Sequence, residues 1–161
     1  MSEPGISLRD PAHRVSPRAR AMWTVSAVVE GAVALGVLLV AVLVWEVPAW
    51  TLAALAVVVV SWAAVVPRWR FLVHRWETTD TAVYTQTGWW ARERRIAPMS
   101  RIQTVDYVES AIARLYRLAS VTVTTASAAG ALRIDGLDRE VARRLVDDLT
   151  RQADAVDGDA T

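Results

Sequence analysis

The sequence contains no cysteine and no lysine, and its only histidines are His13 and His74. Without cysteine there is no disulfide, no thiolate metal site and no thiol nucleophile. Without lysine there is no Walker-type phosphate-binding lysine, no Schiff base and no lysine general base. Two histidines are also too few for a histidine-rich zinc site. We therefore expect no catalytic residue, no bound metal and no cofactor.

The charges argue against a second group of functions. The 18 arginines nearly balance 17 acidic residues, so the formal net charge is only +1, which disfavours nucleic-acid binding. His74 stands among arginines and is interpreted as a plain polar residue beside a membrane. Four aspartates near the C-terminus could suggest a calcium or magnesium site, but they lack the spacing of an EF-hand loop. They are Asp135, Asp138, Asp147 and Asp148. No small-molecule substrate is indicated.

Hydrophobic residues make up 53% of the 161-residue chain, and they concentrate in two runs. Residues 22–44 hold a single charge, Glu30, and residues 48–66 hold none. A helix of about 20 apolar residues crosses the hydrocarbon layer of a bilayer. We predict a transmembrane hairpin over residues 21–67. A signal peptide does not fit, because its apolar core is shorter and no second span would follow it.

The flanks of the two runs predict their orientation. Arginines stand before the first run and after the second, whereas the short connection WEVPA has none, so the positive-inside rule places both termini in the cytoplasm. We expect residues 1–20 to be disordered and the second span to end at Pro67. Residues at the span ends are predicted to anchor in the headgroup layers; they are Trp23, Trp45, Trp50, Trp69, Arg68 and Arg70.

Glu30 lies about 12 Å of helical rise into the first span. An intramembrane carboxylate indicates proton coupling or pairing with a basic residue of another subunit. The alternative is a glutamate in a close-packed helix seam, because Glu30 lies among the small residues Ala27, Gly31, Ala32 and Gly36. The sequence leaves both interpretations open.

Residues 71–153 have the pattern of several short antiparallel strands followed by one helix. The segment SVTVTTAS from Ser120 is the clearest strand, because it is rich in β-branched residues. Asp138 is a good N-cap for the helix, which carries a stripe of apolar residues. We expect an α+β protein whose strands form a partly closed barrel or two orthogonal sheets. Residues 154–161 are acidic and are predicted to be a disordered tail. The predicted strands are residues 76–79, 83–87, 89–96, 102–108, 120–127 and 132–134.

Three motifs in this region resemble a known family. They are RERRIAP with SRIQTVD, ARLYRLASVTVTTAS, and IDGLDREVARRL, and over about residues 76–150 the chain resembles the pleckstrin-homology (PH) domain of YdbS-like bacterial membrane proteins. Ala97 stands where the family usually has a bulky apolar residue, and Arg117 where it has a glycine. The resemblance implies a PH-like fold in a membrane-tethered binding or assembly module, with no catalytic residues to transfer.

A basic, tryptophan-rich stretch is the candidate binding surface. Residues 68–101 carry seven arginines and three acidic residues, a net charge of +4, and residues 102–161 carry −3. Such a strand close behind a membrane span can face anionic headgroups. The alternative is an ordinary strand whose arginines pair with acidic neighbours and whose tryptophan fills the core. The patch consists of Trp89, Trp90, Arg92, Arg94, Arg95 and Arg101.

These observations predict a non-catalytic protein-interaction or assembly module anchored at the inner face of a bacterial plasma membrane. The expected partners are membrane lipids and another membrane protein, either a related PH-domain protein or a second copy of the chain. Two alternatives stay open. One is a subunit of a transport or export complex that uses Glu30, and the other is a sensor of anionic lipid surfaces that uses the arginine and tryptophan strand.

Overall fold

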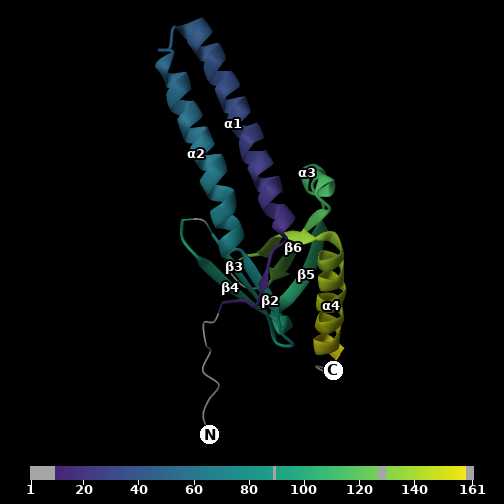
Figure 1. The fold of residues 1–161 in the computed structure, drawn as a ribbon. Coiled ribbons are helices and arrows are strands. Elements are labelled where there is room, and N and C mark those ends of the chain that lie inside the picture. Colours follow the sequence, from purple (N-terminus) through teal and green to yellow (C-terminus); the bar gives the residue numbers. More distant parts are fainter. Residues whose placement is uncertain (1–9, 89, 127–129, 159–161) are drawn as a thin grey trace.

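Two long helices rise from one side of a small β-rich domain in the computed structural model, which describes residues 10–88, 90–126 and 130–158 (Figure 1). The helices α1 (Pro17–Trp45) and α2 (Trp50–Val73) run side by side. Both are long and apolar enough to cross a membrane, and their apolar side chains are mostly exposed. The domain combines antiparallel sheets with a C-terminal helix, so the predicted α+β class is confirmed.

The pairing of α1 with α2 uses part of the small-residue pattern. Ala27 and Gly31 are buried, and a Cβ placed on Gly31 would lie only 2.2 Å from Cγ1 of Val59 on α2. Gly36 has no neighbour within 4 Å of such a Cβ. Ala27 and Gly31 therefore bring α1 against α2 within the chain, and the close approach needs the missing side chain of Gly31.

The second helix does not end at Pro67, contrary to the expectation from sequence. Pro67 lies inside α2, and its side chain is fully buried. Proline removes one backbone hydrogen bond from a helix interior, but here packing against the domain holds the last turns in place. The backbone N–H of His74 then donates to the carbonyl of Arg70 at 2.9 Å. One residue, His74, separates α2 from the next strand.

The strands form two separate sheets rather than a closed barrel. The first sheet has the order β1-β2-β3-β4 and the second β5-β6-β7, and every pairing is antiparallel. The first sheet contains β1 (His13–Arg14), β2 (Arg75–Thr78), β3 (Ala82–Thr87) and β4 (Glu93–Pro98). The second contains β5 (Ile102–Val108), β6 (Leu118–Thr125) and β7 (Leu132–Asp138). The remaining elements are η1 (Met99–Arg101), α3 (Ala111–Leu115) and α4 (Arg139–Gly158).

Several predicted boundaries are wrong. Residues 10–20 are ordered: β1 pairs with β2, and Val15 and Ala19 are buried because they pack on the domain. The helix α4 continues to Gly158 through the start of the expected disordered tail. The third predicted strand begins at residue 93, and β7 passes through Gly136, which has a φ of 73°. Residues 1–9, 89, 127–129 and 159–161 lie outside the described residues.

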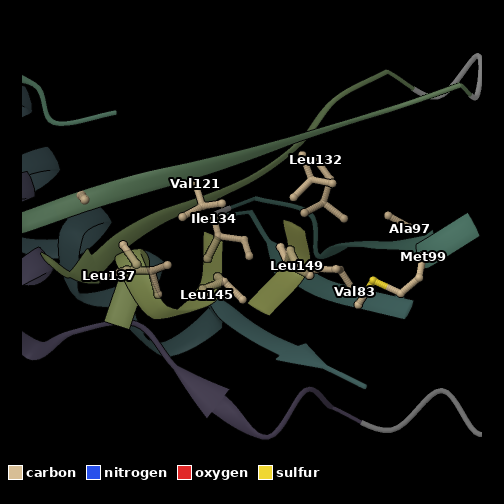
Figure 2. Close-up of a cluster of buried hydrophobic side chains, with 12 residues drawn as sticks. Val83, Ala97, Met99, Val121, Leu132, Ile134, Leu137, Leu145 and Leu149 are labelled. Carbon is tan, nitrogen blue, oxygen red and sulfur yellow. The ribbon is translucent and has the colours of Figure 1, made fainter. Parts of the chain in front are cut away.

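The core of the domain lies between the two sheets and α4 (Figure 2). Val83 and Ala97 come from the first sheet, and Val121 comes from the second. The apolar stripe of α4 closes this core with Leu145 and Leu149, as its three- and four-residue spacing predicts. We call this set the domain core; its buried members are Val83, Ala97, Met99, Ala119, Val121, Val123, Leu132, Ile134, Leu137, Ala142, Leu145 and Leu149.

The fold accommodates both residues that differ from the family pattern, Ala97 and Arg117. Ala97 is 3% exposed and belongs to the domain core. Arg117 has a φ of 55°, the left-handed conformation that glycine adopts without strain. Its carbonyl accepts a hydrogen bond from the N–H of Arg139 at 3.0 Å, which ties the turn to the start of α4. The turn keeps its shape although an arginine occupies it.

Candidate functional site

The base of α1 is packed directly onto the domain. A second group of buried residues, here called the junction cluster, consists of Val15, Ala19, Trp23, Ala113 and Leu118. Next to it, the N–H of Ser16 donates to the carbonyl of Gly136 at 2.8 Å. A Cβ on Gly136 would lie 2.6 Å from the Cβ of Ala19. The close approach of α1 to β7 therefore requires glycine at position 136 and a side chain as small as alanine at position 19.

Polar contacts reinforce the junction from α2. The guanidinium of Arg70 lies over the Trp23 ring, 4.3 Å from its centroid, and its Nη2 is 3.4 Å from Asp135. The same aspartate accepts hydrogen bonds from Ser120 and Arg133 on the second sheet. Arg70 thus connects both long helices to β7. The sequence did not indicate these contacts of Arg70, and its predicted role as a headgroup anchor stays a prediction.

His74 is buried at this junction. It is 6% exposed, its Nδ1 lies 2.8 Å from the carbonyl oxygen of Arg70, and Nε of Arg70 donates to its Nε2 at 3.4 Å. Burial lowers the pKa of His74, and the neighbouring Arg70 charge lowers it further. The ring also lies against Trp23, with centroids 5.2 Å apart. His74 is therefore a buried structural residue rather than an exposed polar one.

Glu30 opens onto a cavity between the two helices and the domain. The cavity has a volume of about 410 Å³ and is lined by residues of α1, α2 and the end of β3. Its polar lining includes Ser26, Glu30, Arg70 and His74. No basic residue near Glu30 could be identified from the sequence, because Arg70 lies at the end of the other helix. The fold brings a carboxyl group, a guanidinium cation and an imidazole to the walls of one cavity.

The structure divides the predicted basic patch. Arg94 pairs with Asp10 and donates to Gln86 at 2.9 Å. Arg95 pairs with Glu93 at 2.6 Å. These two arginines follow the alternative interpretation, in which outward arginines pair with neighbours.

The rest of the patch is more open. Arg92 and Arg101 are exposed and make no ion pair with the described residues. Trp90 is 88% exposed, and Trp89 lies outside the described residues. Within the predicted patch, the described arginines without an ion pair therefore lie in the loop before β4 and in η1 after it.

The predicted membrane anchors fall into two groups. Trp45 and Trp50 are 72% and 70% exposed at the far ends of the helices. Trp69 is 45% exposed near the other end, and Arg68 donates to the carbonyl of Ala64 at 3.1 Å. Trp23, in contrast, is buried in the junction cluster. The position of Trp23 at the end of a predicted span did not reveal that the domain covers it.

Sequence reasoning missed the surface of α3. Its residue Leu115 is 82% exposed, whereas Ala113 two positions earlier is buried in the junction cluster. Ser110 caps the helix by accepting a hydrogen bond from the N–H of Ala113 at 3.2 Å. The signal was present in the sequence: Ile112 and Leu115 are three residues apart beside basic residues, and on a helix this spacing places them on one face.

The aspartates considered as cation ligands are used elsewhere. Asp135 and Asp138 bind arginines of the junction. Within residues 10–88, 90–126 and 130–158, no group of three or more histidine, aspartate or glutamate side chains is arranged to hold a metal ion. Asp138 also accepts a hydrogen bond from Ser16 at 3.0 Å. Its observed contacts tie the start of α1 to the domain.

Comparison with known proteins agrees with this architecture. The sequence model of the family described as "Bacterial PH domain" matches residues 24–153, including most of both long helices. The "UPF0699 transmembrane protein YdbS" of Bacillus subtilis (strain 168) is 31% identical over 156 residues, which cover 92% of this chain and 97% of that protein. No solved structure matches significantly. The chain therefore belongs to the bacterial PH domain family and is a membrane-anchored, PH-like protein.

Proposed function

We propose that the chain is a non-catalytic assembly module, which holds another membrane protein against the inner face of the bacterial plasma membrane. The observation that carries the proposal is the junction between the helices and the domain. Close packing at Gly136 and the Arg70–Asp135 ion pair fix the domain in one orientation. A domain fixed in this way presents the same surface to every partner that moves in the membrane.

The orientation in the membrane is part of the proposal. Arginines are found on the two chain segments next to the domain and are absent from the connection between α1 and α2. The positive-inside rule then places the domain and both termini in the cytoplasm. The arginines that support this orientation are Arg14, Arg18, Arg20, Arg68, Arg70 and Arg75.

The edge of the first sheet is the proposed docking surface. Among the residues that the structure describes, β4 pairs only with β3. The N–H of Met99 donates to the carbonyl of Thr81 at 2.9 Å. Along an antiparallel pair, every second residue forms backbone hydrogen bonds with the partner strand. In this register residues 93, 95 and 97 form them with β3, so the backbone N–H and C=O groups of Arg94 and Ile96 point to the open side of β4. An extended segment of another membrane protein can add to such an edge.

Photocrosslinking from β4 tests the assembly role. Amine-reactive reagents are unsuitable because the sequence has no lysine. A photoreactive amino acid should therefore replace Ile96, which is 46% exposed, in the full-length chain in native membranes. The matched control carries the same group at Thr150, an exposed position on α4. We expect one discrete adduct from position 96 and none from position 150.

The mass of the adduct identifies the form of assembly. Twice the mass of the chain indicates a second copy, and another mass indicates a different membrane protein. Absence of an adduct at position 96, or the same mixture of adducts from both positions, would contradict the docking surface.

A second candidate function is a subunit of a transport or export complex. It is favoured by the position of Glu30, which shares a cavity with Arg70 and His74. Replacing Glu30 with Gln keeps the shape of the side chain and removes its charge. An assembly module should retain its crosslinked partner in the Glu30→Gln variant, whereas a transport path that needs the charge should lose transport. Retained assembly with lost transport would establish the second function.

A lipid-surface sensor is the third candidate, and it is favoured by the exposure of Trp90. It would use the two patch arginines that form no ion pair with described residues, Arg92 and Arg101. The double variant Arg92→Gln, Arg101→Gln should then weaken the enrichment of anionic lipid around the full-length chain. The matched variant Arg144→Gln, Arg151→Gln, at exposed positions of α4, should not. Equal enrichment in both variants would contradict a sensor role.

A further inference from the structure

The short helix α3 exposes apolar side chains beside the base of α1. Leu115 is 82% exposed and Ile112 is 39% exposed. The side chain between them in the helix, Ala113, is buried in the junction cluster. The helix is therefore anchored through Ala113 while its apolar face is directed outward.

The position of α3 matches the level at which the first span begins. Ala113 and Trp23 belong to one buried cluster, and the predicted span starts at residue 22. Figure 1 shows α3 on the same side of the sheets as α1 and α2. A bilayer that contains the two long helices therefore has its near surface at the level of α3.

The charges around α3 suit an anionic surface. Arg114 and Arg117 are exposed on either side of Leu115. The nearest acidic residue in sequence, Glu109, is already paired with Arg139 at 2.8 Å and accepts a hydrogen bond from Tyr107. The exposed Arg114 and Arg117 can attract anionic headgroups, and the exposed Ile112 and Leu115 beside them can enter the interface.

We propose that α3 is a third membrane contact, in which Ile112 and Leu115 insert into the headgroup layer and Arg114 and Arg117 bind lipid phosphates. The occupant is the bilayer itself, because α3 continues the membrane-facing side defined by α1 and α2. This contact goes beyond the assembly role, since it concerns the tilt of the domain and needs no protein partner. Two helices alone let the helices and the domain tilt together in the bilayer, about the line that joins the helices.

Site-specific fluorescence tests the proposal, because the chain lacks cysteine and accepts a single label. Full-length Leu115→Cys, Asp147→Cys and Val33→Cys variants each carry one polarity-sensitive fluorophore. They are placed singly in nanodiscs of phosphatidylcholine and phosphatidylglycerol. Asp147 is an exposed control on α4, and Val33 is a 63% exposed position in the first span. Quenching is measured with aqueous acrylamide and with a nitroxide attached near the lipid headgroup.

The label at position 115 should be several-fold less accessible to acrylamide than the label at position 147. It should also be quenched by the shallow lipid nitroxide more strongly than the label at position 147. The label at position 33 should be shielded from acrylamide as well, which verifies insertion. Equal behaviour of positions 115 and 147 would overturn the proposal. Shielding of position 115 from acrylamide without quenching by lipid would overturn it too, because protein would then cover α3.

Discussion

The domain core and the junction cluster are built from different residues. The domain core contains large aliphatic side chains from both sheets and α4, such as Leu137 and Leu149. The junction depends on small residues, with Ala19 against Gly136, and on polar contacts of Arg70. The core stabilises the domain through buried apolar volume. The junction also buries Trp23 and Leu118, and it adds the close approach of α1 to β7 that fixes the position of the helices.

The largest effect should come from a cavity in the domain core. Leu149 is 1% exposed beneath the two sheets, and truncating a buried leucine to alanine costs about 2–5 kcal/mol. We expect Leu149→Ala to lower the free energy of unfolding of the full chain in detergent by this amount. Urea unfolding followed by circular dichroism measures the change. The adjacent exposed Thr150→Ala is the control and should stay within about 0.5 kcal/mol of the parent.

A substitution at Gly136 should disturb the junction more than the domain core. Valine there must adopt a φ of 73° and would press on Ala19, and strained backbone of this kind costs about 1–3 kcal/mol. We expect faster hydrogen exchange in residues 15–20 of Gly136→Val. The control is Gly130→Val, because Gly130 has a φ of 76° but no neighbour within 4 Å of an added Cβ. Similar exchange in both variants would show that backbone strain alone is responsible.

Two arginines of the predicted patch should behave differently. Arg94 bonds to Gln86, whose side chain donates to the carbonyl of Val73 at the end of α2. Replacing Arg94 with Ala should destabilise the chain by about 0.5–1.5 kcal/mol. Arg92 forms no ion pair with the described residues, and Arg92→Ala should change stability by less than about 0.5 kcal/mol. Thermal unfolding in detergent compares them, and equal losses would contradict this division of the patch.

The smallest effect should come from pH, because it changes one charge at the junction and removes no side chain. The pKa of His74 is lower in the folded chain than in the unfolded chain, because burial and Arg70 oppose the added proton. The unfolded chain therefore binds more protons between the folded pKa and about 6.5, and stability falls as pH is lowered through this window. The slope should disappear in His74→Gln. An unchanged slope in that variant would assign it to other groups.

Local patterns were sufficient to predict much of the fold. The spacing of Leu145 and Leu149 predicts the buried face of α4, and β-branched residues around Val121 and Val123 predict β6. Two long apolar runs predict α1 and α2. In each case the information lies within one segment, because periodicity and composition act over neighbouring residues.

The candidate site was less predictable because it depends on contacts between distant segments. Trp23 has the composition signal of a lipid anchor, but Arg70 and His74 surround it. Val15 lies two residues before Pro17 in a segment that was predicted to be disordered, yet it is buried on the domain. Pro67 normally ends a helix, and only its tertiary packing explains why α2 continues. None of these environments follows from the spacing of residues along the chain.

The single residue between α2 and β2 has a mechanical consequence. His74 is buried, and its backbone and side chain both bond to the carbonyl of Arg70, so the connection leaves little slack for the helix to turn independently of the strand. A bilayer that is thinner or thicker changes the tilt of the helices it contains. With one residue between them, a change in the tilt of α2 would also turn β2, the second strand of the first sheet.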